Sequence, residues 1–167
     1  MHALLHIPLI AVLAAPALAG DAQSAITTFN AWCFKAGQTQ SDARSNMQAE
    51  GAPFALTFWD DSLAPRPADA PKGIERRCEL VFDGDHTAAA LDALHVQMAK
   101  PPVFGTPIPL PDTHRATADT TFIQGRELLR GRVAVVHIGT RTDAASTQTF
   151  MAVDRLYPGL GLPQERP

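Results

Sequence analysis

The sequence contains none of the short motifs that identify common enzyme classes. It lacks a GxSxG nucleophile elbow, an HExxH zinc motif, a P-loop and a GxGxxG dinucleotide fingerprint. It also lacks an internal repeat, which excludes a coiled-coil rod or a collagen. We therefore predict no catalytic residue and no cofactor.

Charge is scarce and has no basic excess. Only 19% of the 167 residues are charged, 46% are hydrophobic, and 14 basic against 17 acidic residues leave a formal net charge of -3. A mostly disordered chain would have fewer apolar residues and more charge. Because no surplus of positive charge is available to neutralise phosphates, we expect no nucleic-acid partner. The composition is typical of one soluble globular domain.

The first twenty residues are apolar and carry no charged side chain. They end in Ala17-Leu18-Ala19, the small-x-small pattern that signal peptidase recognises. A transmembrane anchor would need about 20 uninterrupted apolar residues, and two prolines interrupt this run. We predict a Sec-type signal peptide over residues 1–19 with cleavage after Ala19. The mature chain is then periplasmic or secreted, with no transmembrane anchor. Eleven of the 14 basic residues are arginine, which is typical of a GC-rich bacterial genome.

The chain has only two cysteines, Cys33 and Cys78, and no CxxC motif. In an exported protein two such cysteines most often form a disulfide, and too few soft ligands are present for a structural zinc site. We predict a Cys33–Cys78 disulfide. Because this bond would close a loop in the unfolded chain, the chain-entropy model gives it a stabilising contribution of roughly 4 kcal/mol.

Hydrophobic periodicity and turn residues predict an α+β fold. The expected architecture is a single small domain over residues 20–156, with a largely antiparallel sheet and helices packed on one side. A flexible C-terminal tail is expected over 157–167, and the proline-rich segment 101–111 is expected to be an extended crossover. The predicted helices are 21–35, 41–51 and 86–100, and the predicted strands are 54–59, 75–82, 120–129, 132–140 and 147–156.

Alternation predicts which side chains face the core. In the strand over 75–82, Cys78 and its alternate neighbours Leu80 and Phe82 share one face, and we expect that face to pack on the helices. Residues 133–138 are apolar at both parities, which indicates a central strand covered on both sides. The aromatic residues Trp32, Phe54, Phe58 and Trp59 are expected to belong to the core.

Four histidines follow the predicted signal peptide: His86, His95, His114 and His137. No two of them are four apart on a predicted helix or two apart on a predicted strand, so spacing predicts no shared metal site. His137 stands in an otherwise apolar strand. We expect a neighbouring hydroxyl such as that of Thr121 or Thr149 to form a hydrogen bond with its imidazole, although a ligand-binding or proton-transfer role stays open.

Arginines gather near the C-terminal hairpin, which is the only local charge asymmetry. A group of cross-strand arginines can bind a carboxylate, a phosphate or an anionic membrane surface. Alternatively, Glu127, Asp143, Asp154 and solvent neutralise them. The group consists of Arg115, Arg126, Arg130, Arg132 and Arg141.

These features favour a non-catalytic binding or accessory module. It would capture a small molecule or a partner protein in a groove between sheet and helices, with Trp59, Arg126, Arg132 and His137 as candidate contacts. One alternative is a small periplasmic hydrolase-like enzyme that uses His137 with a carboxylate such as Asp154 or Glu127 and a threonine hydroxyl. Another is a protein whose segment 101–111 docks onto an aromatic groove of a partner.

Overall fold

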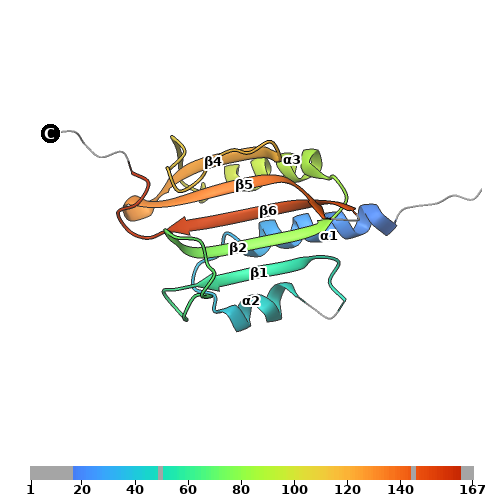
Figure 1. Cartoon of the computed structure of the whole chain (residues 1–167), viewed down its shortest axis with the longest axis horizontal. Helices are drawn as coiled ribbons and strands as arrows, with labels where there is room; N and C mark the ends of the chain where they lie inside the picture. Colours follow the sequence, from blue (N-terminus) through green and yellow to red (C-terminus); the bar gives the residue numbers. More distant parts are fainter. Residues whose placement is uncertain (1–16, 49–50, 144–145, 163–167) are drawn as a thin grey trace, which may run out of the picture.

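The computed structural model describes residues 17–48, 51–143 and 146–162. Within these ranges, six strands form one antiparallel sheet in the order β1-β2-β6-β5-β4-β3 (Figure 1). The strands are β1 (Ala55–Asp60), β2 (Ile74–Asp83), β3 (Thr106–Ile108), β4 (Thr120–Leu128), β5 (Arg132–Asp143) and β6 (Ser146–Leu156).

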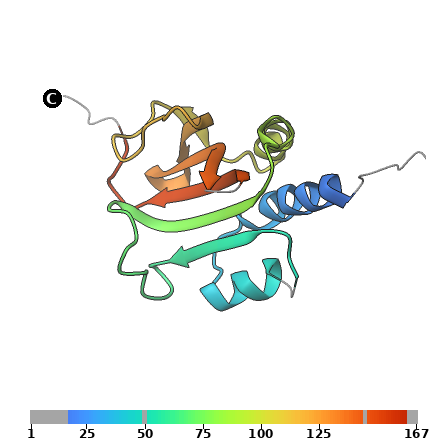
Figure 2. The ribbon, with the colours of Figure 1, turned by 45° about the vertical axis from the view of Figure 1, so that its right-hand side comes forward.

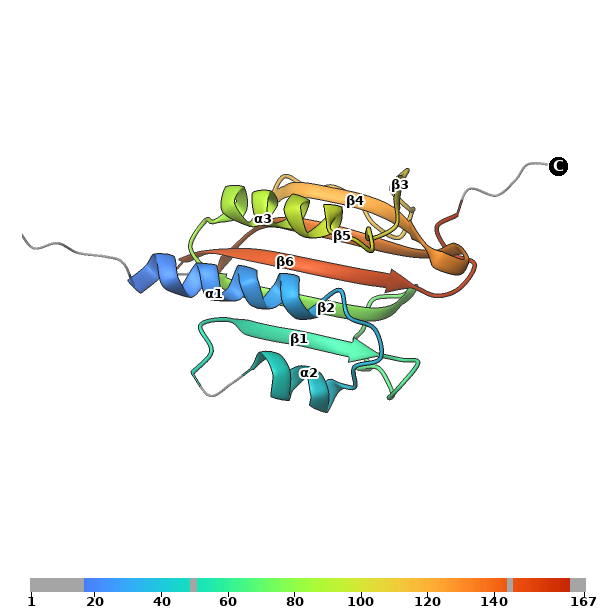
Figure 3. The same ribbon diagram turned by 180° about the vertical axis from the view of Figure 1, so that it is seen from behind.

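The α-helices of the described part all contribute to a core on one face of this sheet. They are α1 (Ala17–Trp32), α2 (Gln40–Met47) and α3 (Thr87–Ala99). Figure 3 shows α1 and α3 in front of the strands, and Figure 2 shows α2 beside the outer strand β1. Phe29 of α1, Met47 of α2 and Leu94 of α3 are buried in the same apolar cluster. The predicted α+β fold, with helices on one side of the sheet, is confirmed.

Alternation along β5 separates the two faces of the sheet. Ala134, Val136 and Ile138 face the helices and belong to the main core. Val133 belongs to a second, smaller cluster on the other face, with Trp59 and Leu156. Because β5 lies between β4 and β6, the prediction of a central strand from the two-sided apolar pattern is confirmed.

The disulfide joins the end of α1 to β2. Cys33 and Cys78 are bonded, with 5.4 Å between their Cα atoms, and both side chains are buried. Leu80 and Phe82 lie in the same core as Cys78, so the predicted parity of this strand is confirmed. The bond ties a helix to the sheet across 45 residues of chain.

Several element boundaries differ from the prediction. The α2 cap is Thr39 rather than Ser41, because the Thr39 hydroxyl accepts from the Asp42 backbone N–H while the Asp42 carboxylate accepts from the Thr39 N–H. This helix ends at Met47, four residues before Gly51. The proline-rich crossover contains a short edge strand, β3, where the missing N–H of Pro107 costs no central hydrogen bond.

The predicted signal peptide lies almost wholly outside the described residues; its last three positions fall in α1. Among the residues that the structure describes, no helix is long and apolar enough to cross a membrane. The predicted tail begins with Tyr157, whose hydroxyl donates to the Asp61 carboxylate, and Leu162 packs on the smaller apolar cluster. Residues 163–167 lie outside the described ranges, as do residues 144–145 between β5 and β6.

Candidate functional site

A groove opens on the helical face, at the C-terminal ends of α1 and α3. Its main cavity has a volume of about 990 Å³. Residues from the end of α1, from the segment after α3 and from the β4–β5 turn line it. A second cavity of about 620 Å³ continues between α1 and α3, and the two share Asn30, Ala31, Gln97 and Lys100. Together they form one groove over the helical layer, of the size typical of small-molecule sites.

The walls of this groove are apolar and partly exposed. Leu129 is 89% exposed, Val103 58% and Val96 60%, and all three line the groove. Phe34 and Phe104 meet edge to face on the same wall, with ring centroids 4.7 Å apart. Exposed apolar side chains gathered around one concavity are typical of a binding surface.

Two lysines supply free positive charge at the groove. Lys35 follows α1, and its ammonium lies 3.6 Å from the centroid of the Trp32 ring; Lys100 caps α3. Within the described residues neither lysine forms an ion pair with a carboxylate. Each helix C-terminal end carries about half a negative charge, which offsets part of the lysine charge.

Arg132 and Arg126, both candidate contacts from the sequence, also belong to this region. Arg132 lines the main cavity and lies 3.7 Å from the Glu75 carboxylate. Arg126 is buried and donates to the backbone oxygens of Phe104 and Gly105, each at 2.9 Å. It therefore holds the wall segment in place rather than presenting its charge to the groove.

The arginine group does not form one anion-binding face. Arg141 makes a two-pronged ion pair with Glu79 at 2.9 and 2.8 Å. Arg115 and Arg130 are exposed. The β2 carboxylates Glu75 and Glu79 pair with Arg132 and Arg141, and Asp154 pairs with Arg77, which is outside the group.

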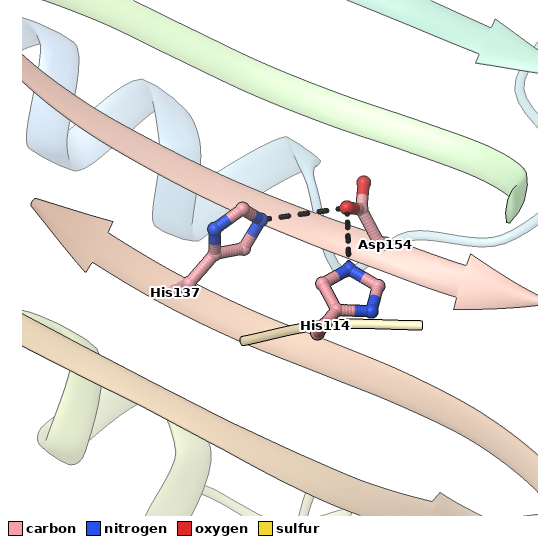
Figure 4. A group of neighbouring side chains, drawn as sticks. All are labelled: His114, His137 and Asp154. Atoms are coloured by element: carbon pink, nitrogen blue, oxygen red, sulfur yellow. Dashed lines mark hydrogen bonds and ion pairs between the residues drawn. The ribbon is translucent and has the colours of Figure 1, made fainter. Parts of the chain in front are cut away.

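On the opposite face, two histidines meet one buried aspartate. His137 of β5 and His114 of the 109–119 segment both direct Nε2 at Oδ2 of Asp154 on β6 (Figure 4). The distances are 3.0 Å from His114 and 3.4 Å from His137. The His114 contact is a hydrogen bond, whereas Nε2 of His137 is buried and has no hydrogen-bond partner among the described residues.

Arg77 keeps Asp154 ionised. Its Nε and Nη2 donate to Oδ1 and Oδ2 of Asp154 at 2.7 and 2.5 Å. Burial alone would raise the pKa of Asp154, but the hydrogen bonds from Arg77 and His114 and the charge of Arg77 outweigh it. The pKa of Asp154 is therefore held well below its usual range, and the group is a carboxylate.

A glycine allows the segment that carries His114 to cross the sheet. A Cβ built on Gly125 of β4 would lie 2.8 Å from the Pro109 oxygen and 3.1 Å from Cδ of Pro111. Only a residue without a side chain permits this approach. The crossing places Thr113 and His114 over β5 and β6, where the Thr113 hydroxyl lies 2.9 Å from Nδ1 of His114.

The other candidate contact, Trp59, lies on this second face. It is buried with Ile74, Val133 and Leu156, and the Arg77 guanidinium lies 5.5 Å from its ring centroid. Phe54 and Phe58 are buried in the main core, and Trp32 is partly buried against it. The structure thus places Arg126 and Arg132 at the groove, and Trp59 and His137 on the opposite face of the sheet.

The hydrolase alternative requires a hydroxyl, an imidazole and a carboxylate in a water-accessible pocket. Asp154 supplies the carboxylate, but neither of the two threonine hydroxyls predicted to contact His137 does so. Thr149 donates to the Gly84 oxygen and accepts from the His86 N–H, and Thr121 is exposed. His137 lines neither cavity of the groove. Neither expected hydroxyl therefore partners His137 as the hydrolase alternative requires.

Residue spacing within single helices and strands did not predict the contact between His114 and His137, because the two residues come from different segments. The ring centroids are nevertheless 5.7 Å apart. The available signal was indirect: a glycine in a predicted strand marks a close backbone approach. Comparison of the chain with protein-family models, curated proteins and solved structures found no match.

Proposed function

We propose that this protein is a non-catalytic binding module that captures an anionic amphiphile, an acyl chain with a carboxylate or phosphate head, in the groove between α1 and α3. The observation that carries the proposal is the groove itself, with exposed apolar walls and two unpaired lysines. Contact with apolar walls contributes affinity but does not depend on the orientation of the ligand. A few charged groups fix that orientation.

The two kinds of side chain define the orientation of the ligand. The apolar chain packs against Phe34, Phe104 and Leu129 in the main cavity. The anionic head lies near Lys35 and Lys100, because neither lysine forms an ion pair with a carboxylate among the described residues. Arg126 contributes indirectly, since it holds the backbone of Phe104.

Chain-length dependence tests the apolar part. Each buried methylene contributes about 0.8 kcal/mol, so calorimetric titration below the critical micelle concentration should show dodecanoate binding roughly 15-fold tighter than decanoate. Phe104→Ala should weaken dodecanoate and neutral 1-dodecanol alike. An affinity independent of chain length would show that the groove does not bury the acyl chain.

Lysine substitutions test the charged part. Lys35→Gln with Lys100→Gln should weaken dodecanoate by about two- to thirtyfold, because partly exposed ion pairs are each worth about 0.2–1 kcal/mol, and should leave 1-dodecanol unchanged. The matched control is Lys72→Gln, which changes the chain's remaining lysine, exposed in the β1–β2 loop. Equal losses in the control and the double variant would reject the proposed head-group site.

We further propose that the chain is exported and acts in a bacterial periplasm. The Cys33–Cys78 disulfide supports an oxidising compartment. Expression of the full chain in a Gram-negative host should yield a periplasmic protein whose N-terminal residue is Gly20. A cytoplasmic product that begins at Met1 would contradict export.

A further inference from the structure

We propose that His114, His137 and Asp154 bind one divalent transition-metal ion of the zinc class, on the face of the sheet opposite the groove. One ligand atom from each of the three residues lies within 4.8 Å of the other two, and Nε2 of both histidines faces Oδ2 of Asp154. Two ligands of a tetrahedral zinc ion, each about 2.1 Å from the metal, are separated by roughly 3.4 Å. The contacts at 3.0 and 3.4 Å already approach this spacing.

The burial of these groups favours an ion. The side chains of His114 and His137 are 7% and 14% exposed, and that of Asp154 is fully buried. Nε2 of His137 points toward Asp154 without a hydrogen-bond partner among the described groups, and such an orphan costs roughly 1–3 kcal/mol. A metal ion bound between the three side chains would satisfy this nitrogen.

The donor set selects the class of ion. Two imidazole nitrogens and one carboxylate oxygen are the ligands of zinc and its transition-metal neighbours, whereas calcium and magnesium prefer sites made of oxygen. Three protein ligands leave a fourth position for water. The cysteines do not compete, because both are in the disulfide.

The groups around the ligands orient them. Each carboxylate oxygen has two lone pairs, so Arg77, which takes one on each oxygen, leaves the second lone pair of Oδ2 for the ion. Thr113 lies next to Nδ1 of His114, where its oxygen accepts Nδ1–H once Nε2 is a ligand. The positive charge of Arg77 lowers the affinity, so we expect binding weaker than at a site without such a neighbour.

Titration of the untagged, EDTA-treated protein with Zn²⁺ tests the site. We expect one Zn²⁺ per chain, and Co²⁺ should give the visible absorption of four-coordinate cobalt. His114→Gln and His137→Ala should each weaken binding by more than about a hundredfold, beyond the ~10–100-fold cost of losing an outer hydrogen-bond partner. Thr113→Val should fall within that lower range.

The matched control is His95→Ala, an exposed histidine of α3, which should bind Zn²⁺ as the wild type does. Because His114 lies on a crossover rather than in the sheet, His114→Gln reports on the site even if His137→Ala impairs folding. The proposal fails if the folded wild type binds no Zn²⁺, or if His114→Gln binds it as tightly as His95→Ala.

Discussion

Buried charged side chains on this sheet differ in how completely hydrogen bonds and ion pairs compensate their charge. Asp154 is fully buried, yet it receives two hydrogen bonds from Arg77 and one from His114. Arg76 is also buried, but the oxygen of its ion-pair partner Asp60 is 3.7 Å away, and two of its nitrogens have no hydrogen-bond partner among the described residues. Burial lowers the pKa of Arg76 to about 10 even though the Asp60 charge opposes this. Burial of charge is therefore compensated at Asp154 and only partly compensated at Arg76.

Asp154→Asn should destabilise the fold by about 3 kcal/mol at pH 7, because it leaves the Arg77 charge without its buried partner. The pKa of Asp154 is depressed in the folded state, so its contribution is complete above the unfolded value of about 4 and declines as pH falls further. The difference between wild type and variant should therefore be smaller at pH 3 than at pH 7. Urea denaturation at both pH values measures it.

The control is Asp69→Asn, which alters an exposed carboxylate in the β1–β2 loop and should change stability by less than about 0.5 kcal/mol. If the difference in unfolding free energy between the wild type and Asp154→Asn stayed constant from pH 7 to pH 3, it would contradict the depressed pKa of Asp154.

Whole elements follow from the sequence where a periodic pattern reaches the core. The alternation around Cys78 identified the buried face of β2, and the two-sided apolar run identified β5 as central, because burial imposes those periods. The crossover that carries His114 has no such period. Its path depends on close contact with β4, which a chain rich in proline does not reveal by itself.

The groove was expected only in outline, between sheet and helices. Its position depends on Leu129, which is 89% exposed in the β4–β5 turn, and on Val103 after α3. Exposed apolar residues in turns have no periodic signature. Arg126 was singled out for its charge, but its role is the hydrogen bonding of backbone oxygens, which depends on the fold around it.

Gly125→Ala should destabilise the protein by about 1–3 kcal/mol, because the new methyl group would press on Pro109 and Pro111. The comparison variant is Thr121→Ala, at an exposed position of the same strand, which should change stability by less than about 0.5 kcal/mol. Chemical denaturation of both variants measures the difference. If Gly125→Ala were as harmless as Thr121→Ala, the proline-rich segment would not be pressed against β4.

At the scale of the whole molecule, one sheet separates two unrelated surfaces. The groove lies among the helices on one face. His114, His137 and Asp154 meet on the other face, where the 109–119 segment crosses the sheet (Figure 4). Arg155 of β6 lines the groove, while the adjacent Asp154 points to the opposite side. Arg155 pairs with Asp60 and Glu75 and Asp154 with Arg77, so these neighbours share no ion-pair partner.

The two proposed sites should therefore bind independently. Sites without shared partners usually add within about 0.5 kcal/mol, so a substitution on one face should change affinity on the other by no more than about twofold. Calorimetry with reciprocal variants tests this without mixing Zn²⁺ and fatty acid, which precipitate together. His137→Ala should bind dodecanoate like the wild type, and Phe104→Ala should bind Zn²⁺ like the wild type. A tenfold cross-effect in either direction would show instead that β5 and β6 transmit a change from one face to the other.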